Sequence, residues 1–195
     1  KKPFPKLRYL DLSYTHISDA GLGVLARSLD LRRLSLKHTA VTQKGVARLV
    51  ALVGLRALNL AQTRVNDAGM VHVNRLSNLQ VLRLDGTSLT DAGLQDLSGL
   101  KHLRRLHLGH TKITQDGLPH LVFARALRTL ALENTQLKGS GLRALDAFKK
   151  LRRLNVHHAL LPEWGEGLKY FADLTSLEWL DVGNTDAPQL KYLSK

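Results

Sequence analysis

A leucine recurs every 24 residues through most of this 195-residue chain, and this repetition constrains the fold more than any other feature. In each unit the first leucine is followed, three and five residues later, by another leucine or a valine. With this first leucine as position 1, the units open at Leu7, Leu31, Leu55, Leu79, Leu103, Leu127, Leu151 and Leu177. We expect residues 1–195 to form one domain of about eight stacked units.

The hydrophobic period changes midway through each unit, which predicts a strand followed by a helix. Leucines at positions 4 and 6, such as Leu58 and Leu60, alternate with polar residues as in a half-buried strand. Apolar residues at positions 16 and 19, such as Leu94 and Leu97, have the spacing of one helix face. Each unit is therefore predicted to be a short strand, a turn and a short helix.

Polar residues at positions 12 and 13 predict where each helix begins. A side-chain oxygen at position 12 can cap the helix N-terminus, as expected for Ser18, Thr42, Asn66, Thr90 and Thr114. Aspartates at position 13 are favoured by the helix dipole, as expected for Asp19, Asp67 and Asp91. We interpret the glycine at position 15 of the first seven units as a residue that serves the turn.

A single unit is too small to bury its own leucines, so the units must stack. Stacking places the strands side by side in one parallel sheet and the helices in a second layer. Because helices are wider than strands, we expect the stack to curve with its sheet on the inner side. The predicted fold class is α/β, a curved solenoid with a concave parallel sheet and helices on the convex side.

Two segments carry the pattern most clearly, LRYLDLSYTHISDAGLGVL at residues 7–25 and LQVLRLDGTSLTDAGLQDL at residues 79–97. Their shared pattern, L-x-x-L-x-L-x-x-T-x-[IVL]-[ST]-D-A-G-L, resembles a leucine-rich repeat of the helix-bearing subclass seen in F-box proteins and many bacterial repeat proteins. The resemblance covers residues 7–193. It implies a leucine-rich-repeat solenoid and does not specify a partner, because this fold serves many functions.

Position 9 departs from the family, which usually carries Asn or Cys there. This chain has threonine instead, at Thr15, Thr39, Thr63, Thr87, Thr111, Thr135 and Thr185. A threonine hydroxyl can bond to a backbone group in the turn after the strand. We therefore expect a buried hydrogen-bonding ladder rather than a row of catalytic residues.

The seventh unit is two residues longer than the others and breaks the pattern. Ala159 replaces the threonine, Pro162 replaces the N-cap, and Trp164 follows. We expect residues 157–168 to form a turn unlike the rest. Two interpretations remain open, sequence drift in a loop or a protrusion that binds a partner through an exposed Trp164.

Composition limits the possible partners and compartments. A formal net charge of +13 predicts attraction to acidic proteins, nucleic acid or anionic lipid. The chain has no cysteine, which favours the cytoplasm or another reducing compartment. No apolar run is long enough for a transmembrane helix, so we expect no membrane insertion. Because the chain begins with Lys1 and stops within its eighth unit, we expect it to be a fragment of a longer protein.

The candidate binding surface consists of the strand residues that alternate with the leucines, at positions 3, 5, 7 and 8, with position 2 at the strand entrance. Eleven of these residues are basic and five are acidic. The candidate partner-binding residues are Arg32, Arg33, Lys37, Arg56, Arg83, Arg104, Arg105, His107, Arg128, Arg152, Arg153 and Trp179. The arginines at position 2 have two interpretations, a solvated row that covers the leucines or a strip that binds carboxylates or phosphates.

Histidines also gather on this surface, at His38, His107, His110, His157 and His158. Glu133 and His157 share position 7 of adjacent strands and could pair. A metal site needs three or four converging ligands, and none is predicted. We expect no cofactor and no catalytic residue, because no nucleophile, paired carboxylate or phosphate-binding glycine loop stands out.

These observations favour a non-enzymatic protein-protein interaction module that recognises an acidic partner through a basic concave face. The alternatives are a scaffold or RNA-contacting subunit of a large assembly, or the substrate-recognition repeats of a ubiquitin-ligase-type protein. Nucleic acid is the less favoured partner because the inner-face aromatics, Tyr9, Tyr14 and Trp179, lie at the two ends. Binders of single strands usually interleave aromatic and basic residues along a groove.

Overall fold

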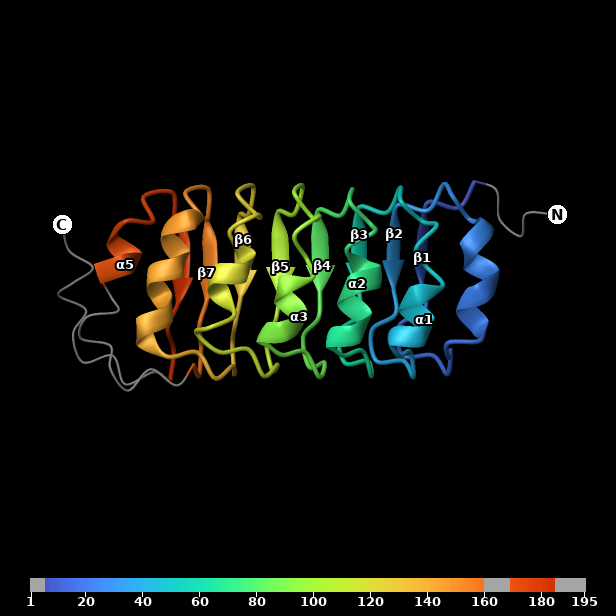
Figure 1. The fold of residues 1–195 in the computed structure, drawn as a ribbon, viewed down its shortest axis with the longest axis horizontal. Coiled ribbons are helices and arrows are strands. Elements are labelled where there is room, and N and C mark those ends of the chain that lie inside the picture. The colour runs from blue at the N-terminus through green and yellow to red at the C-terminus, as the bar shows by residue number, and fades with distance from the viewer. Residues whose placement is uncertain (1–5, 160–168, 185–195) are drawn as a thin grey trace.

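The computed structural model describes residues 6–159 and 169–184, which form one sheet of eight parallel strands in chain order. Each strand has three residues, at positions 3 to 5 of its unit. The strands are β1 (Tyr9–Asp11), β2 (Arg33–Ser35), β3 (Ala57–Asn59), β4 (Val81–Arg83), β5 (Arg105–His107), β6 (Thr129–Ala131), β7 (Arg153–Asn155) and β8 (Trp179–Asp181). Figure 1 shows the strands side by side behind a row of helices, which confirms the predicted α/β solenoid.

A short helical segment follows each of the first seven strands. The segments are η1 (Gly21–Arg27), α1 (Gln43–Ala47), η2 (Asp67–Gly69), α2 (Met70–Val73), α3 (Asp91–Gln95), η3 (Leu118–Leu121), η4 (Gly139–Ala147) and α5 (Lys169–Ala172). Four of these are 3-10 helices, marked η, a distinction that hydrophobic spacing does not make. The lengths of η2 and η3 are usual for the 3-10 form, whereas η1 and η4, with seven and nine residues, are longer than usual. Pro119 also removes a backbone donor at the start of η3. None of the described helices has the length and apolar character that crossing a membrane requires.

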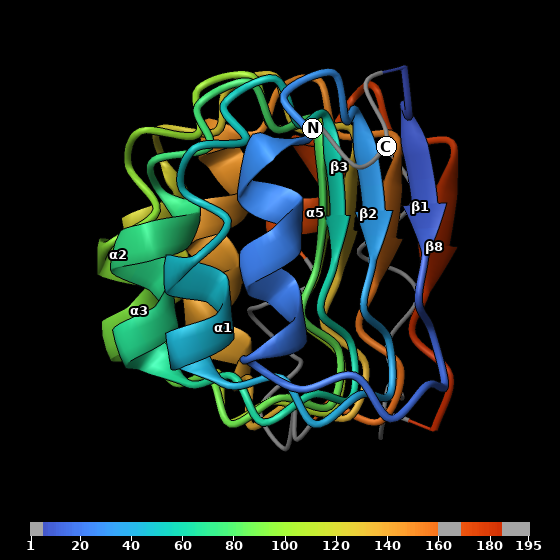
Figure 2. The same ribbon diagram turned by 90° about the vertical axis from the view of Figure 1, so that its right-hand side faces the viewer.

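The sheet is open and curved, with the helices on its convex side. Figure 2 looks along the stack and shows the helices on one side and the strands on the other. In this view the end strands β1 and β8 lie farther from the helices than β3 does. The inner surface of the sheet is therefore concave, as expected from the greater width of the helices.

The core is one continuous column of leucines that runs the length of the stack. At position 4 the strands place Leu58 directly opposite Leu34 and Leu82, and all three are 2% exposed or less. Only in the end strands are the equivalent residues, Leu10 and Leu180, partly exposed. The prediction that Leu58 and Leu82 are fully buried is confirmed.

The threonine ladder at position 9 is also confirmed. The five inner threonines are buried, namely Thr39, Thr63, Thr87, Thr111 and Thr135. Each donates its hydroxyl to the backbone carbonyl of position 6 in the same unit, as Thr87 does to Leu84 at 2.7 Å. The ladder therefore gives each of these carbonyls a short side-chain hydrogen bond, which at Leu84 adds to the longer one from the backbone N–H of Thr87 at 3.2 Å.

Aspartates at position 13 connect neighbouring units in a way that the sequence did not reveal. Asp91 accepts one hydrogen bond from the backbone N–H of Thr114 at 2.9 Å and another from its hydroxyl at 2.6 Å. The same two bonds, which we call the inter-unit staple, join Asp19 to Thr42 and Asp67 to Thr90. These carboxylates act mainly between units, in addition to any effect on their own helix.

The staple explains the glycine at position 15. A Cβ atom at this position of the next unit would collide with the stapling carboxylate, at Gly45, Gly93 and Gly117. Gly117 has a φ of −77°, which other residues adopt readily, so its backbone conformation does not require glycine. At Gly45, Gly93 and Gly117 glycine is therefore needed to admit the aspartate of the preceding unit, a reason that the expected role in the turn did not include.

The predicted N-caps form at two of the five positions, Thr42 before α1 and Thr90 before α3. Each accepts a hydrogen bond from the backbone N–H two residues ahead. Thr114 makes the same kind of hydrogen bond, but the residue that precedes η3 is Gly117. Asn66 makes no such bond, and the residue that precedes η1 is Ala20 rather than Ser18. The staple and the cap use the same threonine hydroxyl, which donates to the aspartate and accepts from the helix.

The seventh unit begins its turn as the other units do. Position 8 has a left-handed φ, between 51° and 66°, at Tyr14, His38, Gln62, Gly86, His110, Asn134, His158 and Asn184. Ala159 then donates its backbone N–H to Val156 at 3.0 Å. The expected departure is therefore not found at residues 157–159. Residues 160–168, with Trp164, lie outside the described residues, so the prediction for them stays a prediction.

Candidate functional site

The concave surface carries the largest group of basic side chains that the sequence predicted. Arg33, Arg105 and Arg153 occupy equivalent places in β2, β5 and β7, and all three are exposed. Arg105 and Arg153 are two strands apart, roughly 10 Å, whereas Arg33 is roughly 14 Å from Arg105. The fold therefore separates the predicted residues into a central group, in β4 to β8, and a smaller group around β2.

The carboxylates of this surface are engaged with neighbours. Asp85 pairs with Arg83 at 3.3 Å, and Glu178 pairs with Arg152 at 2.8 Å. Asp11 accepts hydrogen bonds from the backbone N–H of Ser13 at 2.8 Å and from the hydroxyl of Tyr9 at 3.1 Å. These bonds, with those from Ser13 largest, lower the pKa of Asp11. Three of the five acidic residues therefore have their charge offset or bound by groups of the same chain.

Asp181 is the fourth carboxylate, at the C-terminal end of the sheet. It accepts a hydrogen bond from the backbone N–H of Gly183 at 2.9 Å and lies 3.1 Å from Nδ1 of His157. The Gly183 N–H, together with His157, lowers the pKa of Asp181. At neutral pH Asp181 is therefore an ionised group that is already hydrogen-bonded.

The basic side chains of the surface outnumber the available carboxylates. Within the described residues, three of the eleven lie within 4 Å of a carboxylate oxygen, namely Arg83 with Asp85, Arg152 with Glu178 and Arg32 with Asp30. The eight without such a partner are Arg8, Arg33, Lys37, Arg56, Arg104, Arg105, Arg128 and Arg153. Lys37 lies over the ring of Tyr14 at 5.1 Å, a cation–π contact. The concave face therefore has an excess of positive charge that residues 6–159 and 169–184 do not neutralise.

A hollow of about 330 Å³ lies within the central basic group. It forms because β6 presents the small residues Thr129 and Ala131 between the larger side chains of the strands on each side. Its lining includes Arg83, His107, Thr129, Ala131, Glu133, Arg153, Asn155 and Trp179. Trp179 is 46% exposed at the edge, so the hollow combines cations with an accessible aromatic ring.

A second hollow of about 420 Å³ adjoins the first towards the N-terminal units. It shares Arg83 and Glu133 with the first hollow and also reaches Lys37, Asp85 and His110. The two hollows make one trench that crosses the strands. The trench brings Lys37 to the same surface as Arg153, although these residues are far apart in the sequence.

His107 in the trench is uncharged at neutral pH. Burial lowers its pKa below the ordinary value of 6.5, the carboxylate of Asp85 opposes this, and Arg83 and Arg105 add to the lowering. The charge of the trench at neutral pH therefore comes from arginine and lysine. His107 contributes a neutral ring that can donate or accept a hydrogen bond.

The suggested pair between Glu133 and His157 does not form. His157 turns to Asp181 instead, and Glu133 Oε2 is buried without a hydrogen-bond partner. The carboxylate of Glu133 lies against Gly109, where a Cβ atom would collide with it. Gly109, at position 7 of the fifth unit, has no side chain, and the carboxylate of Glu133 lies in the space this leaves, on the opposite side from His157.

Metal-binding geometry is not found in the described parts of the chain. Among residues 6–159 and 169–184, no three His, Asp or Glu side chains gather closely enough to hold an ion. His38, His110 and His158 all occupy position 8, with a left-handed backbone. They belong to the second, fifth and seventh units, so at least one whole unit lies between any two of them. The other predicted site residue, Trp164, lies outside the described residues.

Family models match two parts of the sequence. A model described as "Leucine rich repeat" matches residues 53–113, and another described as "Leucine Rich repeat" matches residues 5–26. Among curated proteins, none matches this chain in sequence.

Solved structures with similar folds include two internalins of Listeria monocytogenes. The internalin inlF has a TM-score of 0.66 at 20% identity over 94% of this chain, and internalin C2 has 0.68 at 21% over 89%. The Arabidopsis receptor kinase HAESA, solved with the peptide hormone IDA and the co-receptor SERK1, has 0.65 at 15% over 94%. The chain spans 57% of the inlF chain, 80% of the internalin C2 chain and 35% of the receptor-kinase chain. At these identities the similarity shows the fold alone.

Proposed function

The chain is a leucine-rich-repeat protein, and we propose that it is a protein-protein interaction module that recognises an acidic partner through its concave face. The partner is expected to lie in the trench between Lys37 and Trp179. The comparison structures support the general role, because the similar receptor-kinase chain was solved in complex with a peptide hormone and a co-receptor.

The observation that carries the proposal is the unequal pairing of charges on the concave face. Four of its five carboxylates are bound by neighbouring groups, whereas eight of its eleven cations have no carboxylate within 4 Å among the described residues. A row of unpaired arginines repels itself, and a partner with carboxylates relieves this repulsion. Arginine also matches a carboxylate with two parallel hydrogen bonds.

Trp179 supplies the second part of the proposed recognition. It stands beside Arg153 in the register of β7 and β8, at the edge of the 330 Å³ hollow. Interface hot spots are enriched in tryptophan and arginine, set in a partly enclosed cavity. We therefore expect the strongest contacts around Arg105, Arg153 and Trp179, with the position-2 arginines adding long-range attraction.

The proposal can be tested with three charge reversals, Arg33→Glu, Arg105→Glu and Arg153→Glu, made together. The probe is a fluorescein-labelled poly-glutamate of about 20 residues, measured by anisotropy at about 50 and about 200 mM NaCl. We expect binding to weaken at least about tenfold, which corresponds to about 1.4 kcal/mol, and the remaining binding to depend less on salt. Thermal unfolding should change little, because exposed substitutions shift stability by about 0.5 kcal/mol or less each.

A matched control separates the concave face from net charge. Arg48→Glu, Lys101→Glu and Arg125→Glu change the net charge equally at exposed residues in and after the helices. Equal weakening by both triple variants would contradict a concave site. A labelled single-stranded RNA of about 20 nucleotides tests the nucleic-acid alternative. Tighter binding of this RNA than of poly-glutamate at matched salt, lost in the concave variant, would overturn the acidic-protein proposal in favour of RNA.

A further inference from the structure

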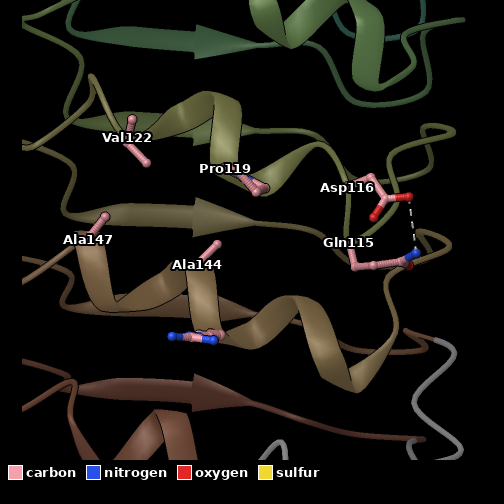
Figure 3. A pocket seen from close by; sticks show the side chains of 7 residues that line it. Gln115, Asp116, Pro119, Val122, Ala144 and Ala147 are labelled. Atoms are coloured by element: carbon pink, nitrogen blue, oxygen red, sulfur yellow. Dashed lines mark hydrogen bonds between the residues drawn. The ribbon is translucent and has the colours of Figure 1, made fainter.

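A cleft of about 480 Å³ lies on the convex side, between η3 of the fifth unit and η4 of the sixth. Figure 3 shows Pro119 of η3 and Val122, the residue after η3, on one wall, facing Ala144 and Ala147 of η4 on the other. Gln115 and Asp116 lie at one end, joined by a hydrogen bond. The cleft is on the opposite side of the molecule from the trench, so it is independent of the proposed concave site.

The preceding junction, between the fourth and fifth units, offers a comparison, because it carries larger residues at the equivalent positions. Asp91 staples to Thr114 there, as described above. Gln95 and His120 bridge the two helices through a hydrogen bond of 3.3 Å between Nε2 atoms. Phe123, at position 21, adds a large and largely covered side chain.

Each of these fillers is replaced at the next junction. The staple residues become Gln115 and Lys138, so the carboxylate and the threonine are both lost. The bridging pair becomes Pro119 and Ala144, which have no side-chain polar groups. Phe123 becomes Ala147. The cleft therefore coincides with the loss of the staple, the bridging pair and the large position-21 residue at one junction, although the junction between the second and third units also lacks the staple.

The lining of the cleft combines apolar walls with unmet polar groups. Val122 is 49% exposed although it is apolar. Gln115 donates from Nε2 to Asp116 at 3.4 Å, and its Oε1 is buried without any donor. Turning the carboxamide over would break this hydrogen bond and set Oε1 against the carboxylate, so the exposed carboxylate of Asp116 is the acceptor that the cleft offers to an N–H group. Arg143 also lines the cleft and has no carboxylate within 4 Å among the described residues.

We propose that this cleft binds the tryptophan side chain of a second protein partner, in a segment with an acidic residue next to that tryptophan. An indole ring has flat apolar faces to set between Pro119 and Ala144, and one N–H to donate to the carboxylate of Asp116 at the end of the cleft. The neighbouring carboxylate pairs with Arg143. The cleft is open to solvent, so it would leave much of a small molecule exposed, unlike most small-molecule sites. A protein partner would cover the edges of the cleft with its own neighbouring residues and exclude water from it.

The test uses the peptide acetyl-Gly-Ser-Asp-Trp-Ser-Gly-amide and the same peptide with alanine in place of tryptophan. Titration into the ¹⁵N-labelled chain is followed by amide chemical shifts. We expect the tryptophan peptide to shift the amides of Val122, Ala144 and Ala147 and to bind at least about tenfold more tightly than the alanine peptide.

Closing the cleft should remove this preference. The variant Pro119→Gln, Ala144→His and Ala147→Phe installs the residues that fill the preceding junction, so it should fold. Ala147→Phe alone serves if the triple variant unfolds. Val71→Gln is the control, because it places the same glutamine at position 17 of another unit, where the side chain is 53% exposed.

The two proposals fail separately. Reversing Arg33, Arg105 and Arg153 should leave the tryptophan preference intact, since these residues lie on the other face. The cleft proposal is overturned by equal affinity for the two peptides, or by a preference that survives cleft closure. It is also overturned by a preference lost only in the concave variant, which would assign the tryptophan to the trench.

Discussion

Replacing Asp91 with alanine removes the staple between the fourth and fifth units. The carboxylate accepts two hydrogen bonds from Thr114, at 2.9 and 2.6 Å, and both partners are partly buried. A hydrogen bond to a charged group contributes about 1.5–3 kcal/mol, and partial exposure reduces this. We therefore expect Asp91→Ala to lower the free energy of unfolding by about 2–4 kcal/mol.

The assay is a double-mutant cycle of Asp91→Ala and Thr114→Val, followed by circular dichroism during urea unfolding. Thr114→Val keeps the backbone N–H, so the cycle isolates the bond between the hydroxyl and the carboxylate. The double variant should lose about 1–2 kcal/mol less than the sum of the single variants, because either change alone removes that bond. The urea dependence of the free energy should stay constant if the units unfold together.

Asp116→Ala is the matched control, since Asp116 is an exposed aspartate near Asp91 in the fold with one hydrogen bond of 3.4 Å. Its loss should change the free energy of unfolding by about 0.5 kcal/mol or less. If Asp91→Ala costs no more than this control, the staple does not stabilise the stack. Additive single variants would show that the two residues act separately, which would also refute the reasoning.

Two further predictions follow from the core and from the trench. Leu82→Ala should lower the free energy of unfolding by about 2–5 kcal/mol, because Leu82 is 0% exposed, whereas Leu29→Ala, at a 52% exposed residue, should cost less than about 1 kcal/mol. Because the pKa of His107 is lowered in the fold, the unfolded chain takes up a proton first as the pH falls through about 6.5. The free energy of unfolding should therefore decrease from about pH 7 to about pH 5, which the midpoint of urea unfolding measures. The decrease should be smaller in the His107→Gln variant. An unchanged pH dependence in that variant would contradict a lowered pKa.

Features that repeat within one unit could be predicted from the sequence. Leu58 and Leu60 show the strand period, and the sheet buries both. The threonine at position 9 recurs with the strand, so Thr87 and its equivalents were expected in a hydrogen-bonding ladder. These features depend on contacts a few residues apart, which a periodic pattern records directly.

Contacts between units were harder to predict, because they join residues 23 positions apart. A signal was present nonetheless. Every aspartate at position 13 of the first five units is followed, 23 residues later, by a threonine, as Asp67 is by Thr90. Gln43 and Gln115 are followed instead by Asn66 and Lys138. Comparing units in adjacent pairs would have identified the staple, whereas comparing them one at a time did not.

Charge counting was informative about the concave face but not about its details. The excess of basic residues can be counted from the sequence, but only the structure shows which arginines form ion pairs with carboxylates. Glu133 shows the difficulty, since its direction depends on the missing side chain of Gly109. The trench depends likewise on the small size of Thr129 and Ala131, a feature that has meaning only beside the larger neighbours in β5 and β7.

Among the first six units, two junctions lack the staple, and at each of them a side-chain oxygen, Asn66 Oδ1 or Gln115 Oε1, is buried without a hydrogen-bond partner. The leucine core is equally buried on both sides of the junction between the fifth and sixth units, so folding tolerates that junction without its staple. Losing the staple nevertheless costs stability, and Gln115 Oε1 is left buried without a donor. Costs of this kind concentrate at functional sites, where local rules are broken for binding. Unpaired arginines on one face and an unfilled cleft on the other therefore fit a scaffold that holds two protein partners on opposite sides.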